Sequence, residues 1–154
     1  MTNSLRLRAG RTNAGFTLIE TIIVLVVIAM MAALITPNVN RAIGHSRVNN
    51  SAGVIAGDLQ LAFSLASRQR TPLRITVDPS GTSYTIATRA GTVIKERTLG
   101  DGADLHVATM TSTVTTLDVF PNGFASGPIS ITVGISGYAQ TITMTRAGQV
   151  RVTS

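Results

Sequence analysis

The sequence predicts an α+β fold in which a long N-terminal helix, apolar in its first half, packs on a small antiparallel β-sheet or sandwich. Three observations predict it. Residues 16–35 form an apolar run whose only charge is Glu20. Residues 37–70 place apolar side chains at helical spacing. From residue 71 onward, short runs rich in Thr, Val and Ile alternate with turn-forming residues, as in antiparallel hairpins.

Length and composition limit the class of protein. A chain of 154 residues has room for about one domain. It contains no Cys, so neither a disulfide framework nor a cysteine metal cluster is available. The formal net charge is +6, but Arg6, Arg8 and Arg11 precede the apolar run, and the other basic residues are scattered among acids. This distribution favours a mixed-charge surface over the dense basic stripe of a nucleic-acid-binding protein.

The apolar run is long enough to cross a membrane once. Twenty helical residues span about 30 Å, which matches the hydrocarbon core of a bilayer. The three N-terminal arginines favour a cytoplasmic N-terminus, although Arg41 and Arg47 on the far side weaken the charge asymmetry. We therefore expect residues 16–36 to form a transmembrane segment and the C-terminal part to be exported.

Glu20 is the unusual feature of this run. A charged residue at the centre of a membrane helix costs about 2.5 to 3.5 kcal/mol, so an ionisable residue there predicts a functional partner. The alternative is a glutamate that reaches the headgroups because it lies near the helix end. A secretory signal has a shorter apolar stretch and a small-residue cleavage site. A plain membrane anchor explains neither Glu20 nor the polar leader that ends at Gly15.

Residues 15–20, Gly-Phe-Thr-Leu-Ile-Glu, resemble the processing motif of type IV pilins and type II secretion pseudopilins. The resemblance implies that a prepilin peptidase removes the basic leader, residues 1–15, by cutting between Gly15 and Phe16, and then methylates the amine of Phe16. It also implies that Glu20 pairs with the N-terminus of an adjacent subunit during filament assembly, and that Pro37 kinks the helix.

Physical chemistry suits these roles. Gly15 has no side chain to obstruct a protease that approaches an extended backbone, so a bulkier residue there should block cleavage. The cut frees an α-amine, whose reference pKa is about 7.7 to 8.0, at the head of an apolar helix. The carboxylate of Glu20, one helical turn away, or that of a neighbouring subunit can neutralise this charge.

The second half of the predicted helix, residues 37–70, is amphipathic. We expect its apolar stripe to pack on the β domain and to leave a remainder for filament contacts. Glycines at 44, 53 and 57 each cost about 0.8 to 1 kcal/mol in a helix interior and predict a bend or local melting there. The stripe contains Val39, Ile43, Val48, Ala52, Ile55, Leu59, Phe63 and Ala66, while Asn49, Asn50, Asp58, Gln60 and Arg68 are expected elsewhere.

Residues 71–154 are expected to form an antiparallel β domain. Turn signals separate the runs, among them Asp78 to Gly81, Phe120 to Gly123 and Gly134 to Gly137. The predicted strands are residues 73–77, 83–88, 92–97, 105–109, 114–120, 129–133, 140–145 and 149–152.

Residues 57–70, 120–123 and 148–152 resemble the GspH/FimT group of minor pseudopilins. The resemblance implies a pilin-like fold in a single-pass inner-membrane protein with a periplasmic C-terminal domain. It implies a minor pseudopilin of the H type, at or near the tip of the periplasmic pseudopilus of a type II secretion system. Its partners would be the prepilin peptidase, other pseudopilins or pilins in a filament, and inner-membrane lipid.

The same resemblance leaves a second function open, that of a FimT-like minor type IV pilin in pilus assembly or DNA uptake. Some members of that group bind DNA through a Gly-Arg-x-Arg element. Here the element reads Gly148-Gln149-Val150-Arg151, so its first arginine is missing, although Arg146 and Arg151 could still converge on DNA.

An enzyme is the hypothesis from a different class. The two histidines, His45 and His106, stand outside any hydrolase or metalloprotease spacing, and no glycine-rich segment has a phosphate-binding pattern. Asp101 and Asp104 supply fewer oxygens than a calcium ion requires. We therefore expect a structural subunit with no catalytic residues, no metal and no cofactor.

Overall fold

The fold is described from a computed structural model, which covers residues 15–100 and 102–154, with the backbone alone at residues 34–37. Most of the predicted leader and Asp101 lie outside the described residues. The chain divides into two compact units, residues 1–39 and 40–154, and each is described by itself. The main helix, α1 (Leu18–Gln69), contributes its first part to one unit and its second part to the other.

The described part of the first unit is helical from Leu18 onward. Every described side chain from residue 15 to residue 33 is exposed. The described side chains of the apolar run therefore belong to no core, and their exposed surface can contact lipid or another protein. By length and composition this helix is capable of crossing a membrane.

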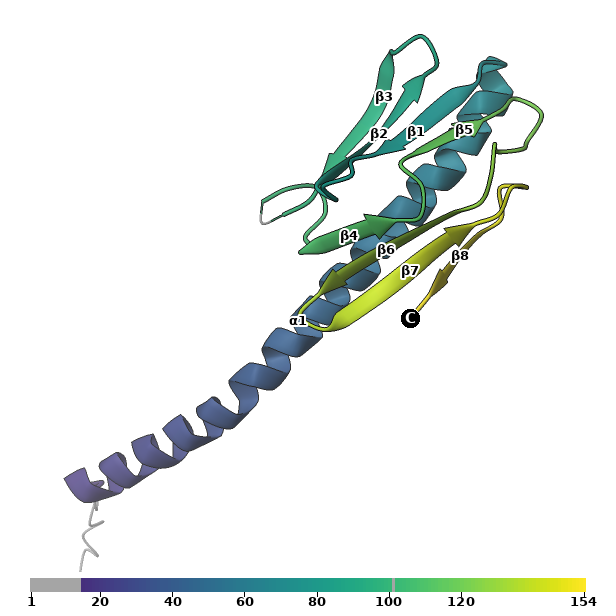
Figure 1. The fold of residues 1–154 in the computed structure, drawn as a ribbon. Helices are drawn as coiled ribbons and strands as arrows, with labels where there is room; N and C mark the ends of the chain where they lie inside the picture. The colour runs from purple at the N-terminus through teal and green to yellow at the C-terminus, as the bar shows by residue number, and fades with distance from the viewer. Residues whose placement is uncertain (1–14, 101) are drawn as a thin grey trace, which may run out of the picture. The chain divides into compact units, whose positions relative to one another are not determined.

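The second unit contains the remainder of α1 and eight strands in two antiparallel sheets (Figure 1). One sheet has the order β3-β2-β1-β5 and the other the order β4-β6-β7-β8. The strands are β1 (Leu73–Val77), β2 (Ser83–Thr88), β3 (Val93–Thr98), β4 (Thr109–Ser112), β5 (Thr116–Val119), β6 (Ile129–Ile135), β7 (Tyr138–Met144) and β8 (Val150–Thr153). The predicted antiparallel architecture is confirmed.

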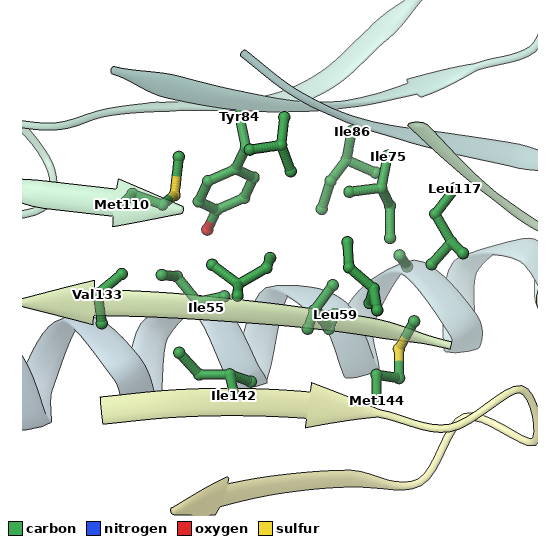
Figure 2. Packing of buried hydrophobic residues seen from close by; sticks show 14 of the residues in the cluster. Ile55, Leu59, Ile75, Tyr84, Ile86, Met110, Leu117, Val133, Ile142 and Met144 are labelled. Atoms are coloured by element: carbon green, nitrogen blue, oxygen red, sulfur yellow. The ribbon is translucent and has the colours of Figure 1, made fainter. Parts of the chain in front are cut away.

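One hydrophobic core joins α1 to both sheets. Figure 2 shows Ile55 and Leu59 of α1 in one buried cluster with Ile75 of the first sheet and Ile142 of the second. The buried apolar residues of α1 are Val48, Ala52, Ile55, Leu59, Ala62 and Ala66. They follow helical spacing, so the predicted stripe is confirmed at Val48, Ala52, Ile55, Leu59 and Ala66. Phe63 is partly buried against the core, whereas Val39 and Ile43 are about half exposed.

Two expectations about α1 are wrong. The helix is continuous through Gly44, Gly53 and Gly57, so the local melting expected there is absent. Burial of the apolar stripe offsets the cost of these glycines. Asp58 was expected away from the buried stripe, but it is only 5% exposed because side chains of β2 and β3 surround its carboxylate.

Two strand predictions, residues 73–77 and 83–88, match β1 and β2 at both ends, five differ from the structure by one or two residues at an end, and one is wrong. Residues 105–109 were expected to form a strand, whereas the strand β4 starts at Thr109 and pairs with β6. Leu105 and Val107 are buried in the core, and Leu105 forms a single bridge with Leu99. The alternation of apolar and polar residues here therefore reflects burial of every second side chain in a connecting segment. This segment does not form the continuous hydrogen bonding of a β-strand.

The β6–β7 hairpin is tighter than the turn predicted at residues 134–137. Ile135 pairs with Tyr138, so the loop consists of Ser136 and Gly137 alone. Both have positive φ, 46° and 84°, as a type I′ turn requires. The strands consequently run to the end of the hairpin and bring Tyr138 beside α1, where its ring stacks on His45.

Candidate processing and assembly site

The predicted cleavage bond lies just before α1, in backbone that is neither helix nor strand. Among the described residues, and apart from its chain neighbours, no atom lies within 4 Å of a Cβ placed on Gly15. Phe16 is 84% exposed, although it is a large apolar residue. The two residues on either side of the predicted cut are therefore accessible to a protease, as the sequence-based hypothesis requires.

Thr17 caps the start of α1. Its Oγ1 accepts a hydrogen bond from the backbone N–H of Glu20 at 3.3 Å, and its carbonyl accepts one from Oγ1 of Thr21 at the same distance. Thr-x-x-Glu is the spacing of a capping box, in which the side chain at the cap satisfies one of the free N–H groups of the first turn. This signal is readable from the sequence, where Glu20 was interpreted as an assembly residue only.

Glu20 lies in the first turn of α1 with its side chain exposed. Among the described residues its carboxylate has no hydrogen bond and no ion pair. An acidic group in the first turn is stabilised by the helix dipole by about 0.3 to 1 kcal/mol. That gain is smaller than the cost of placing a carboxylate in a membrane, so a Glu20 in a membrane would need a further partner. Its exposed side chain is available to such a partner.

Pro37, the predicted kink, lies within the helical segment, because α1 runs without interruption from Leu18 to Gln69. Only the backbone of Pro37 is described, and the kink stays a prediction.

A buried ionic cluster around Asp58 is the feature that the sequence analysis missed. Oδ2 of Asp58 accepts hydrogen bonds from the hydroxyl of Tyr84 at 2.7 Å and from Nε of Arg97 at 3.0 Å. Nζ of Lys95 lies 3.1 Å from Oδ1, and Arg97 also lies 3.5 Å from Asp104. The cluster joins the middle of α1 to strands β2 and β3.

The surroundings of this cluster shift two pKa values in opposite directions. Burial alone would raise the pKa of Asp58, but the hydrogen bonds from Tyr84, Arg97 and Lys95 outweigh it and hold that pKa below its ordinary value. Burial, together with the bond to Asp58, raises the pKa of Tyr84. At neutral pH the cluster therefore holds a charged carboxylate and a neutral phenol, an arrangement suited to fastening β2 and β3 to the helix.

The arginines proposed as DNA contacts lie in the β7–β8 turn and on the strand that follows it. Arg146 is exposed in the turn, and its Nε donates a hydrogen bond to the carbonyl of Ala125 at 3.2 Å. Arg151 is on the edge strand β8, opposite Thr143. Gly148 has a φ of 77°, and a Cβ there would lie 2.7 Å from the ring of Phe63. Turn geometry and packing thus explain the glycine of the Gly148–Arg151 element without DNA.

Side chains suited to metal chemistry are not gathered in the described part of the chain. No group of three or more His, Asp or Glu side chains there is placed to hold a metal ion. His45 stacks on Tyr138, with ring centroids 3.9 Å apart and planes 14° from parallel. His106 lines a pocket together with Asp104 and Leu105.

Comparison with known protein families gives two matches. Residues 51–148 match the family described as Type II transport protein GspH. Residues 10–36 match the Prokaryotic N-terminal methylation motif. The second match contains the Gly15–Glu20 segment, and the first contains Asp58 and almost all of the β domain. No curated protein matches the chain.

Two solved structures are similar over most of their length. The type IV minor pilin FimU of Pseudomonas aeruginosa has 17% sequence identity and a TM-score of 0.58, covering 71% of this chain and 90% of that one. The minor pseudopilin EpsH from the Type 2 Secretion System of Vibrio cholerae has 14% identity and a TM-score of 0.56, covering 70% and 97%. These similarities confirm the predicted pilin-like fold.

Proposed function

The chain belongs to the GspH family of type II transport proteins, and on that premise we propose that it is a minor pseudopilin of a type II secretion system. In this role it is a structural subunit at or near the tip of the periplasmic pseudopilus, where it helps to drive protein export across the outer membrane. The observation that carries the proposal is the order of two matches along the chain: the methylation motif over residues 10–36 is followed by the GspH match over residues 51–148.

The proposed maturation begins at the exposed bond between Gly15 and Phe16. A prepilin peptidase cuts there, removes the leader and methylates the new amine of Phe16. Both residues lie outside the helix, and Phe16 is 84% exposed, which supports access by the enzyme. The cap formed by Thr17 supports the same proposal, because it holds the first turn of α1 independently of the residues that are removed.

The proposed assembly contact is an ion pair between Glu20 and the N-terminal amine of a neighbouring subunit. It is supported by the exposed carboxylate of Glu20, which has no partner among the described residues. In an apolar environment such a pair neutralises two charges that would each be costly alone. The mature subunit is thus a single-pass protein of the inner membrane, inserted through residues 16–36, with its β domain in the periplasm.

Substitution of Gly15 tests the proposed processing. Gly15→Val should leave the leader uncut in cells that contain the peptidase, because the branched side chain obstructs the scissile backbone. Gly15→Ala is the control and should retain part of the cleavage. The measurement is the mass of the chain and of its N-terminal peptide. Mature, methylated protein from Gly15→Val would contradict the proposed site.

Substitution of Glu20 tests assembly separately from processing. Glu20→Ala should be cleaved normally but should no longer crosslink to neighbouring subunits in the membrane. Glu20→Asp keeps the charge and should retain part of the crosslinking, whereas Glu20→Gln should not. Equal crosslinking by all three variants and the original chain would sink the ion-pair proposal.

A FimT-like minor type IV pilin is the second candidate. A specific observation favours it: the FimU structure is as similar in fold as the EpsH structure. Deletion of the gene separates the two candidates. Loss of protein export with intact pili supports secretion, whereas loss of pili or of DNA uptake with normal export supports the pilin function. DNA binding through Arg146 and Arg151 would weaken steeply as salt is raised, because each phosphate contact releases counterions.

A further inference from the structure

Arg41 and Arg47 follow the apolar run, so the proposed topology places both on the exported side, against the usual bias of basic residues toward the cytoplasm. The structure gives these residues a specific setting. They line a pocket of about 380 Å³ between residues 40–47 of α1 and the tip of the β6–β7 hairpin, represented by Ile135 and Ser136. The pocket lies wholly within the unit formed by residues 40–154.

We propose that this pocket binds the phosphate of an anionic phospholipid headgroup in the outer leaflet of the membrane that anchors the chain. This inference rests on the proposed function, because it requires residues 16–36 to span the bilayer. It assigns one ligand class, a phosphodiester that carries a net negative charge, to a site that neither processing nor filament pairing uses.

The lining of the pocket suits a phosphate. Arg41 is exposed, and a guanidinium presents its N–H donors in a fork that fits two phosphate oxygens. His45 is four residues further along the same helix and therefore on the same side of it. The described residues that line the pocket include no acid.

Part of the lining is apolar. Ile43 is 46% exposed, and Ile135 is half-buried at the end of β6. Both are named among the pocket residues together with the backbone of Gly44. An inorganic phosphate gains nothing from contact with these apolar side chains, whereas the glycerol and first methylenes of a lipid would bury their surface. The mixture of basic and apolar groups therefore favours a lipid over an inorganic ion.

A hydrogen-bonded network holds one wall of the pocket in place. The ring of His45 stacks on Tyr138 at 3.9 Å. The hydroxyl of Tyr138 donates to Oδ1 of Asn49 at 3.0 Å, and Nε2 of Gln140 donates to the same oxygen at 2.8 Å. These bonds tie the hairpin to α1 and restrict the imidazole, which lowers the entropy lost when a ligand binds.

The position of the pocket along the chain fits a headgroup. Arg41 follows the end of the apolar run at residue 35 by six residues. In the continuous helix six residues rise about 9 Å, and the long side chain of Arg41 can extend back toward the membrane from there. Headgroup regions extend about 5 to 7 Å beyond the hydrocarbon core on each side. An arginine so soon after the membrane segment is within reach of lipid phosphates.

The test uses the full-length chain in bilayers that contain equal amounts of phosphatidylcholine and phosphatidylglycerol. After mild extraction, native mass spectrometry counts the lipids that remain bound. We expect the original chain to retain phosphatidylglycerol preferentially. Arg41→Gln should reduce this preference about fivefold, as expected for one cationic group near a membrane surface. Arg41→Lys should restore part of it, since the charge returns without the fork.

Arg68→Gln is the matched control, because it removes the same charge from an exposed position on the same helix. It should leave the preference unchanged. A loss as large as that of Arg41→Gln would overturn the proposal, and so would equal retention of both lipids by the original chain. Displacement of the lipid by inorganic phosphate would also overturn it, since the site would then belong to a free anion.

The same samples separate this inference from the proposed function. Resistance of the chain to extraction by alkaline carbonate reports membrane anchoring on its own. A chain that is washed out refutes the anchoring by residues 16–36, and the lipid proposal falls with it. A chain that stays in the membrane but shows no preference for phosphatidylglycerol refutes the lipid site alone.

Discussion

Replacement of Asp58 is the most informative perturbation of the β domain. Asp58 is 5% exposed, and its carboxylate contacts Tyr84, Lys95 and Arg97 at 2.7, 3.1 and 3.0 Å. The variant Asp58→Ala removes the acceptor of all three. Asp58→Asn removes the charge and replaces one acceptor oxygen by an NH2 donor, but keeps the other acceptor. Comparison of the two variants therefore shows how much stability one remaining acceptor without a charge retains.

The expected loss follows from burial. Removal of one partner from a buried ion pair costs about 3 to 5 kcal/mol when the remaining charge stays buried. Here the side chains of Lys95 and Arg97 are 32% and 23% exposed, so they can turn toward water after the substitution. The hydroxyl of Tyr84 cannot, because that residue is 1% exposed. We expect Asp58→Ala to lower the free energy of unfolding by about 2 to 3 kcal/mol, and Asp58→Asn by about 1 to 2.

The pH dependence has a definite sign. The pKa of Asp58 is lower in the folded chain than in the unfolded chain, where an aspartate titrates near about 3.9. The carboxylate therefore stabilises the fold fully above that pH, and its contribution is lost as the pH falls through the lower folded value. The free energy of unfolding of Asp58→Asn should lack this component, so its difference from the original chain should shrink as the pH falls below about 4.

The assay is urea unfolding of the full-length chain in detergent micelles, followed by pulse proteolysis. A double-mutant cycle with Tyr84→Phe isolates the bond at 2.7 Å. Glu96→Gln is the control, because Glu96 is exposed on the same strand as Lys95 and Arg97. Its effect should stay within about 0.5 kcal/mol. Additive effects of Asp58→Ala and Tyr84→Phe, within about 0.5 kcal/mol, would refute the coupling between Asp58 and Tyr84.

Three further predictions use the same unfolding assay. Gly57→Ala should raise the free energy of unfolding by about 0.8 to 1 kcal/mol, because a Cβ there meets open space within a helix; a decrease would contradict this. Gly81→Ala should lower it by more than about 1 kcal/mol, since φ is 69° and the Cβ would collide with the carbonyl oxygen of Met110; an unchanged midpoint would contradict this. Arg74→Gln should destabilise the chain less in high salt than in low salt, because its pair with Asp118 at 2.8 Å is partly exposed; no salt dependence would contradict an electrostatic contribution.

The helix and most strands were predictable because their signals are local. Alternating Thr, Val and Ile mark β1, β2, β6 and β7 within a few residues, since one face of each strand is buried. The segment at residues 105–109 misled the prediction for a related reason. Its alternation also reports burial, but the neighbouring backbone decides whether a ladder forms, and β6 pairs with residues 109–112 instead.

In the candidate site, too, the features encoded by adjacent residues were predictable and those that join distant segments were not. The processing motif is read from six consecutive residues, and the structure adds that Phe16 is exposed and that Thr17 caps the helix. Asp58 was misplaced because an isolated carboxylate on a helix is ordinarily a surface residue. Its burial depends on residues 26 to 39 positions away that complete its hydrogen bonds.

By itself, the sequence determined the long apolar-to-amphipathic helix, the antiparallel β domain and the motif from Gly15 to Glu20, because each is encoded by short-range periodicity or adjacent residues. Only the tertiary structure decided that Asp58 is an interior anion and that Arg41 and His45 line a pocket with the β6–β7 hairpin. Both features join segments far apart in the chain, and their electrostatic energy depends on distance and burial in the folded state, which no local pattern specifies.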